Sequence, residues 1–524
     1  MNFVNASRYW QGWRMKMSNE RYQLHWITAI ISVLKTLKEM MIPIIVLVFV
    51  NGVNDTGVWF IDYFTFIMFG IALLLFFISG IVKWKRYVYW FEDDELRIEY
   101  GLFVKKKRYI PFDRIQSLDY TESILHRPFK LVKVSVETAG ESATLSAEAE
   151  LTAITKEAAT VIEQELAAAK KRKQLEANGE YFEGIEQSED ESVIPTRQAT
   201  TIFQMPMKDL LILATTSGGV GLILSGAIAF LSQFIDVLPL KEIYDEMAIF
   251  VKSGILFIAI LVVIGLFIVW GISVFMTLLA YYSFTVQLED EDLIITRGLL
   301  EKKRATVPLK RVQSIRIVEN PFRQLFGYAA VIIDNPGGGI SGDGARIKLM
   351  PLVKKARIME PLQQLFPDVH FEVPTTKLHG RSKRFYYRLH YVWTLPVIAS
   401  VSYFYFPYGL LSILLIPLVM LLGIWRHHSA AYDLTENQLT MRSRVFSLET
   451  TYVKKNRIQS MQMKQNYFHR KNKVATIAAA IKSGMVPIFA EVKHMEESEA
   501  VQIMKWYEPK NRRAHKEEEK SEGN

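Results

Sequence analysis

Two long runs with almost no charge limit what this chain can fold into. Residues 58–82 carry one charged side chain, Asp62, and residues 254–279 carry none. Each run exceeds the roughly 20 apolar residues that an α-helix needs to cross a membrane. Half of the chain is hydrophobic, yet 22% of its residues are charged, so we predict membrane helices that alternate with soluble domains.

Four weaker runs complete three helical hairpins. Residues 210–234 are uncharged and rich in small residues, which favour close packing between membrane helices. Residues 28–53 are interrupted by three charged side chains, so part of this run could lie along the interface. Residues 392–406 and 410–425 are joined by a Pro-Tyr-Gly turn at 407–409. We therefore predict six spans.

The distribution of Lys and Arg sets the orientation of these hairpins. The tips at 51–57 and 406–409 contain neither residue, and the middle tip contains Lys241, whereas the opposite flanks are strongly basic. Positive flanks lie in the cytoplasm, so we place both termini and all large loops there, in a multi-pass protein of the cell membrane. These flanks also account for the net charge of +9, so a nucleic-acid partner is not needed.

An internal repeat follows the hairpins. Residues 96–140 align without a gap with residues 293–337 at an offset of 197, and 14 of the 45 positions are identical. A third copy retains the Arg-x-Gln-Ser motif, and such repeats normally mean one structural unit duplicated. Strand alternation separates the Arg and Gln from the intervening apolar residue, so we predict a structural role for the motif rather than a binding role. Its residues are Arg114, Gln116, Ser117, Arg311, Gln313, Ser314, Arg457, Gln459 and Ser460.

Each copy reads as strands followed by a helix, which predicts an α+β domain. Polar turns between alternating apolar residues predict β-hairpins at 91–96, 288–293 and 434–439. Further strands are expected at 132–136 and 329–333, and closing helices at 151–175, 354–366 and 496–507.

The expected domain boundaries follow from these elements and from composition. We predict an N-terminal segment with hairpin 1 at 1–86, domain 1 at 87–175, a charged linker at 176–199, hairpin 2 at 200–281, domain 2 at 282–372, a basic flank with hairpin 3 at 373–426, domain 3 at 427–509, and a disordered tail at 510–524.

The repeated motifs resemble the bacterial pleckstrin-homology-like (PH-like), membrane-flanked domain family. The resemblance is carried by Gly-Leu-x-x-Lys-Lys at Gly101 and Gly298, by Pro111 and Pro308, by the Arg-x-Gln-Ser motifs, and by a Leu-His-aromatic entry to the first and third hairpins. It implies that each cytoplasmic domain is a seven-stranded β-sandwich with a C-terminal helix. It also implies no known catalytic activity, and a sister membrane protein with one such domain as a partner.

A basic run after each repeated glycine is the candidate lipid-facing site. Near an anionic leaflet each such charge contributes about 1 kcal/mol of attraction. An ordinary solvated turn is an equally good interpretation, because the third copy lacks the run. The candidates are Lys105, Lys106, Lys107, Arg108, Lys302, Lys303 and Arg304.

The sequence contains no recognisable catalytic, cofactor-binding or metal-binding constellation. We therefore expect a non-enzymatic, membrane-anchored scaffold with membrane lipids and a sister membrane protein as partners, acting in cell-envelope function. A lipid or small-molecule transporter is the alternative, because Asp62 and Lys252 are ionisable groups at the ends of spans.

Overall fold

The computed structural model describes residues 21–35, 37–38, 59–138, 149–177, 199–217, 255–339, 344–482 and 487–508. Within these ranges the chain is an α+β protein built from antiparallel sheets and helices. It folds as two compact units. The first holds the described residues up to 177 together with 210–285 and 294–306, and the second holds 199–209, 286–293 and the described residues from 307 onwards.

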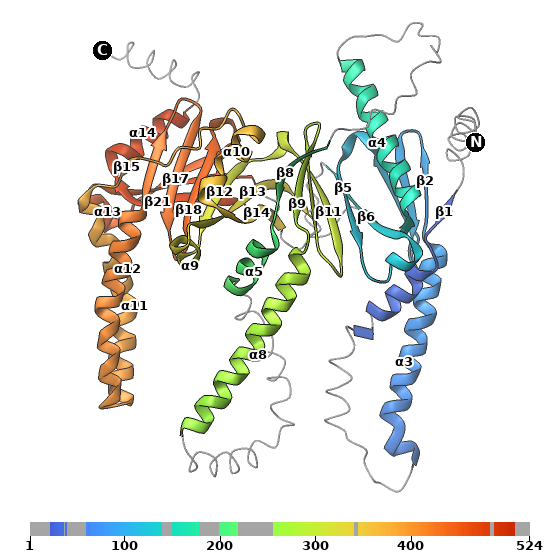
Figure 1. The fold of residues 1–524 in the computed structure, drawn as a ribbon, viewed down its shortest axis with the longest axis horizontal. Coiled ribbons are helices and arrows are strands. Elements are labelled where there is room, and N and C mark those ends of the chain that lie inside the picture. The colour runs from blue at the N-terminus through green and yellow to red at the C-terminus, as the bar shows by residue number, and fades with distance from the viewer. Residues whose placement is uncertain are drawn as a thin grey trace. The chain divides into compact units, whose positions relative to one another are not determined.

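The first copy of the repeat is a sandwich of two sheets closed by a helix (Figure 1). Leu96 and Ile98 of one sheet, Val134 of the other and Ile162 of the helix share a single buried core. Its first sheet is formed by β1 (Tyr22–Gln23), β2 (Val88–Glu92), β3 (Glu95–Tyr100) and β4 (Lys106–Pro111). Its second sheet contains β5 (Ile115–Glu122), β6 (Leu131–Thr138) and β7 (Ala149–Thr155), and the helix is α4 (Lys156–Ala177). This copy has the strand number and closing helix that the PH-like resemblance implies.

The second and third copies repeat this order of elements. In the third, Met441, Ile477 and Ile503 bring both sheets and the closing helix into one core. The second contains β8 (Thr200–Gln204), β9 (Thr285–Glu289), β10 (Asp292–Arg297), β11 (Lys302–Pro308), β12 (Ser314–Glu319), α9 (Pro321–Leu325), β13 (Tyr328–Gly339), β14 (Gly344–Lys354) and α10 (Met359–Leu365). The third contains β15 (Thr376–Lys377), β16 (Ala431–Leu434), β17 (Gln438–Arg444), β18 (Leu448–Lys454), β19 (Ile458–Lys464), α13 (Tyr467–Lys471), β20 (Val474–Ile481), β21 (Ile488–Glu496) and α14 (Glu497–Tyr507).

The sheets run from one copy into the next. A four-stranded sheet, β1-β2-β3-β4, begins the series, and a three-stranded sheet, β19-β20-β21, ends it. Between them are two seven-stranded sheets, ordered β7-β6-β5-β11-β10-β9-β8 and β14-β13-β12-β18-β17-β16-β15. The fifth strand of one copy therefore pairs with the fourth strand of the following copy.

The predicted hairpins are confirmed. Two-residue turns join β2 to β3 and β9 to β10, and Asp93, Asp94 and Asp290 have positive φ values between 53° and 57°. Asp tolerates this left-handed conformation better than most residues, and two-residue hairpin turns require it. The strands expected at 132–136 and 329–333 lie within β6 and β13.

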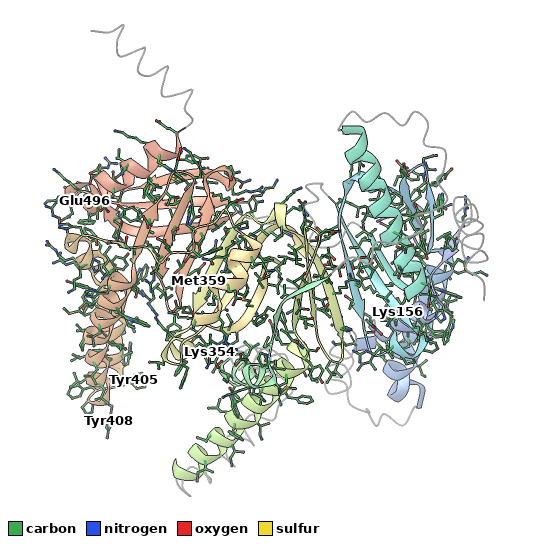
Figure 2. The ribbon with its side chains drawn as sticks, turned by 45° about the horizontal axis from the view of Figure 1, so that its top comes forward. Lys156, Lys354, Met359, Tyr405, Tyr408 and Glu496 are labelled. Atoms are coloured by element: carbon green, nitrogen blue, oxygen red, sulfur yellow. The ribbon has the colours of Figure 1, made fainter. Side chains whose placement is uncertain are left out.

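The first closing helix begins later than predicted. Residues 151–155 belong to β7, and Lys156, labelled in Figure 2, is the first residue of α4. Leu151 and Ala153 are buried at a spacing of two residues, which is the period of a strand. The prediction of a helix from 151 was wrong because an alanine-rich helix follows this strand without a break. In the second copy Lys354 likewise ends β14, and α10 starts only at Met359.

The described helices that precede the domains are α3 (Trp59–Arg86), α5 (Met207–Thr216), α8 (Ile255–Tyr281), α11 (Lys383–Phe404) and α12 (Leu415–Ser429). By length and hydropathy, two described segments could cross a membrane, at 263–281 and 408–429. Helices α11 and α12 lie side by side as a hairpin, with Tyr405 and Tyr408 at its tip (Figures 1 and 2). The helix resumes as a 3-10 turn at Tyr408, so the connection, residues 405–407, lies two residues earlier than the predicted turn.

Several predictions fall outside the described residues. These are most of the span at 210–234, much of that at 28–53, the charged linker beyond 177 and the tail. Lys252 is also outside, and Asp62 lies in α3 with its side chain not described.

Candidate membrane-facing surface and domain junctions

In each copy, the loop between the third and fourth strands contacts the end of the helix that precedes the domain. We call these tip loops: residues 101–105, 298–301 and 445–447. The guanidinium of Arg86, the last residue of α3, donates a hydrogen bond to the Leu102 carbonyl at 2.5 Å. The Leu299 amide donates to the Leu279 carbonyl of α8 at 2.9 Å. Arg426 of α12 donates to the Val445 carbonyl at 2.8 Å.

The repeated glycines make the first two tip loops possible. Gly101 has a φ of +132° and Gly298 a φ of +103°. A Cβ atom at either position would stand 2.0 Å from the carbonyl oxygen of Val104 or 2.1 Å from that of Glu301. Only glycine fits such a close approach of backbone at positive φ, so the glycines in the repeat motif serve the loop that meets the helix end.

The tip loops carry apolar side chains that remain exposed within the chain. Phe103 is 92% exposed and Val104 70%. The corresponding exposed residues of the other two copies are Leu299, Leu300, Val445 and Phe446.

A second apolar loop, the connector between the fifth and sixth strands, contacts the segment that leads into the hairpin in the first and third copies. The Phe129 ring lies 5.7 Å from that of Trp26, just before the first described helical turns. In the third copy His469 packs on Phe385 of α11 at 5.2 Å between ring centroids. The exposed apolar residues of the three connectors are Ile124, Leu125, Phe129, Phe322, Leu325, Phe326, Tyr467 and Phe468.

Tip loops thus place exposed apolar groups beside helix ends in every copy, and connectors do so in the first and third copies. Aromatic and branched apolar side chains in such positions are suited to the interfacial layer of a membrane. The sequence analysis considered only the charges that follow Phe103 and Val104. The missed signal was this apolar pair, placed between a turn glycine and a basic run.

In the first copy the basic run lies at an exposed strand edge. Lys105, Lys106 and Lys107 are all exposed. The ammonium groups of Lys105 and Lys107 lie 2.6 and 3.3 Å from the Glu99 carboxylate on β3. The hydrogen bond from Lys105, with support from Lys107, holds the pKa of Glu99 below its usual value.

In the second copy the basic run lies along the first copy. Lys302, Lys303 and Arg304 of β11 are the antiparallel partners of Glu122, Thr121 and Tyr120 on β5. The guanidinium of Arg304 lies 5.7 Å from the centre of the Tyr120 ring and 3.6 Å from the Glu163 carboxylate of α4.

A buried carboxylate also belongs to this first junction. The Thr306 amide donates to the Asp119 carboxylate at 3.2 Å. Burial, with a smaller contribution from Glu137, raises the pKa of Asp119 to about 7.

The second junction joins β12 of the second copy to β18 of the third over six paired positions. Arg316, which is 3% exposed, donates from Nε to the Asp334 carboxylate at 2.6 Å and from Nη1 to Glu449 of β18. Asp334 is fully buried and also accepts from the Ser314 hydroxyl. A charge network therefore lies at the centre of this junction.

The Arg-x-Gln-Ser motif lies at the start of each fifth strand. In the first two copies, whose fifth strands form the junctions, its serine donates a hydrogen bond to a carboxylate on the sixth strand. Ser117 donates to Glu137 of β6 at 2.8 Å, as Ser314 does to Asp334 of β13. In the third copy Ala480 is the strand partner of Ser460, and Ser460 is exposed.

The other motif residues contact backbone where their side chains are described. Gln313 donates to the Arg311 carbonyl at 2.7 Å, and Arg457 donates to the Lys310 carbonyl of the second copy at 2.6 Å. Arg114 and Gln459 are exposed, and the side chain of Gln116 is not described.

Across the described ranges, no group of three or more His, Asp or Glu side chains is arranged to hold a metal ion. The closest histidine pair is His469 and His494, whose ring nitrogens are 3.0 Å apart. Burial, with the neighbouring His469, lowers the pKa of His494 to about 3.

Known proteins resemble this chain over most of its length. Residues 42–170, 213–365 and 392–511 match the bacterial PH domain family. The chain is 34% identical over 497 residues to the UPF0699 transmembrane protein YdbT of Bacillus subtilis (strain 168), covering 94% of this chain and 99% of the relative. No solved structure matches it. Each matched segment includes the β-rich core of one repeat copy.

Proposed function

Because this chain belongs to the family of bacterial PH domain proteins, we propose that it is a membrane-anchored scaffold without catalytic activity, whose three domains form one platform at the cytoplasmic face. It crosses the membrane six times with both termini inside the cell. Its partner is a sister membrane protein that carries a single PH-like domain, and the pair acts in the cell envelope.

The observation that carries this proposal is the shared placement of the tip loops. Arg86, Leu279 and Arg426, each near the end of a helix, hydrogen-bond to the tip loop of the domain that follows. The apolar side chains of all three loops consequently lie where helix and domain meet. An exposed apolar patch in this position favours contact with lipid over contact with water.

The joined sheets support a platform rather than three independent modules. Strand pairing at each junction supplies backbone hydrogen bonds, and Arg316 forms an ion pair with Glu449 across the second junction.

An environment-sensitive fluorophore tests the orientation of the platform. The chain has no cysteine, so Phe446→Cys and Glu436→Cys each create one labelling site. The two residues follow and precede β17, whose seven residues span about 20 Å. We expect the probe at Phe446 to emit at shorter wavelength in nanodiscs and to be quenched by lipid-attached quenchers, while the probe at Glu436 behaves as in water. Equal responses would contradict the proposed orientation.

Cysteine labelling in intact cells tests the topology. Asn54→Cys should react with an impermeant reagent from outside, and Asn524→Cys only after the membrane is opened. Labelling of both sites from the same side would contradict the six-span arrangement.

A further inference from the structure

The edge of β4 differs from the edges of its two counterparts. The fourth strands β11 and β18 each lie between two neighbours, whereas β4 ends its sheet with β3 as its neighbour in the described structure. Lys106, Lys107 and Tyr109 of β4 are exposed, while the four central residues of β18, Thr450 to Val453, are buried. The first copy therefore leaves open the edge that the other copies cover.

An open strand edge presents unpaired backbone amide and carbonyl groups that can accept another strand. This chain shows twice which strand its fourth strands accept. β11 pairs with β5, and β18 pairs with β12, so in both cases the neighbour is the fifth strand of a PH-like domain. Because β4 is the counterpart of β11 and β18, we expect its free edge to accept a fifth strand as well.

The charges on β4 specify what such a strand must carry. Its edge follows Lys105 and includes Lys106, Lys107 and Arg108, and Lys105 and Lys107 form ion pairs with Glu99. In the basic run at the equivalent position in β11, Lys302 is the strand partner of Glu122, and Arg304 lies 3.6 Å from the Glu163 carboxylate. Extended to β4, the same register places Glu122 opposite Lys105 and Asp119 opposite Arg108. Opposite charges across paired strands stabilise the pairing, and like charges oppose it.

A second copy of this chain does not meet that requirement. Its open fifth strand is β19, in which Gln462 and Lys464 are exposed. By the repeat alignment, Gln462 and Gln465 stand where Asp119 and Glu122 stand in β5. In the register of the first junction Lys464 would lie opposite Lys106, so head-to-tail pairing would place like charges together.

We propose that the outer edge of β4 binds the fifth strand of a PH-like domain in another protein, and that this strand carries carboxylates at the positions equivalent to Asp119 and Glu122. This deepens the proposed function and rests on it, because it assigns the contact through which the platform holds its partner.

Disulfide trapping with a peptide probe tests this contact. The probe is a synthetic peptide with the sequence of residues 113–123, the acidic fifth strand of the first copy, in which Leu118 is replaced by cysteine. Extending the register of β5 on β11 to β4 places this position opposite Tyr109. Full-length chain carrying Tyr109→Cys, in nanodiscs of neutral lipid, should form a disulfide with the peptide under mild oxidation.

Three controls define the expected result. A peptide with Asp119→Asn and Glu122→Gln should cross-link roughly tenfold more slowly, because it lacks the opposing charges. A peptide with its cysteine at Ser117 should react little, since that side chain points to the other face of the strand. Adding Lys105→Glu, Lys106→Glu and Lys107→Glu to the full-length chain should abolish the fast reaction with the acidic peptide.

Two outcomes would overturn the proposal. Equal rates for the acidic and neutral peptides would show that β4 does not select an acidic strand. Fast cross-linking in neutral discs that is suppressed in discs of anionic phospholipid would assign the lysines to the membrane surface instead. Either result concerns only the edge of β4, whereas the labelling and fluorescence experiments test the membrane platform independently.

Discussion

The two domain junctions use the same backbone pairing with opposite charges. In the first, the fourth strand β11 supplies the cation Arg304, and the preceding copy supplies the anion Glu163. In the second, the fourth strand β18 supplies the anion Glu449, and the preceding copy supplies the cation Arg316. Backbone hydrogen bonds between strands form whatever the side chains are. The charge on the fourth strand, positive in one junction and negative in the other, therefore distinguishes the two junctions, and it disfavours pairing of a fourth strand with the wrong fifth strand.

The junctions also differ in burial. Arg316 is 3% exposed and also pairs with the fully buried Asp334 of its own copy, whereas Arg304 is about one-third exposed; the anions across the two junctions, Glu449 and Glu163, are each about one-third exposed. Removing one partner of a buried pair leaves a charge without compensation, while an exposed pair contributes little. The second junction should therefore be far more sensitive to substitution.

The largest effect is expected for Arg316→Ala. It leaves Asp334 buried without its hydrogen-bonded cation, with Arg346 3.9 Å away, and it removes the ion pair to Glu449 across the junction. The protein should be destabilised by about 3–5 kcal/mol. Thermal unfolding in detergent, followed by tryptophan fluorescence, measures the loss. The double substitution Arg316→Met with Asp334→Leu is the control, and it should recover most of the stability because it removes both charges. A single variant as stable as the parent would contradict the role given to the pair.

The next largest effect concerns pH. Since the pKa of Asp119 is raised to about 7 in the folded state, folding favours its protonated form. Its favourable contribution is present at low pH and is lost as pH rises from about 4 to 7, with a slope of up to about 1.4 kcal/mol per pH unit. Asp119→Asn should therefore raise the melting temperature at pH 8 and have little effect at pH 4. A stabilisation that does not change with pH would argue against titration of Asp119.

A smaller effect is expected from reversing charge at the first junction. Arg304→Glu places two acids together and should cost about 1 kcal/mol, because the pair is partly exposed to water. Adding Glu163→Arg should restore the melting temperature. If the double variant is no more stable than Arg304→Glu alone, the ion pair does not contribute.

The smallest effect is expected for Lys303→Ala. Lys303 of β11 makes a 3.4 Å ion pair with Glu301 of the preceding tip loop, and the Glu301 side chain is half exposed. The substitution should change stability by less than about 0.5 kcal/mol, so the melting temperature should remain that of the parent. A clear fall in the melting temperature would show that the pairing of β11 with β5 also depends on the charge of Lys303.

Local patterns in the sequence predicted local structure well. The acidic turn at Asp93 and Asp94 identified a hairpin because turn geometry depends on neighbouring residues, whereas the glycines Gly101 and Gly298 were noted only as part of the repeated motif. The start of α4 was placed too early, because Leu151 to Thr155 carry both a strand period and helix-forming neighbours.

The junctions could not be predicted in this way. Lys302, Lys303 and Arg304 were interpreted as facing lipid or solvent, because a basic run has the same sequence whether it meets a membrane, water or a strand from another copy. Their partners on β5 are distant in sequence, and single-sequence patterns carry no information about such pairing. Glu163, which pairs with Arg304, was not singled out because it is one of several charged residues on its helix.

The distance between the partners of the first junction has a consequence for synthesis. Asp119 and Thr306 are separated by 187 residues, and the second hairpin lies between them. At roughly 5–20 residues per second, a ribosome needs about 10 to 40 seconds to make that stretch. During this interval β5 has been synthesised, but its neighbour from the second copy, β11, has not. Asp119 and Glu122 keep its edge charged, which protects the nascent chain from pairing with the wrong strand while the rest is translated.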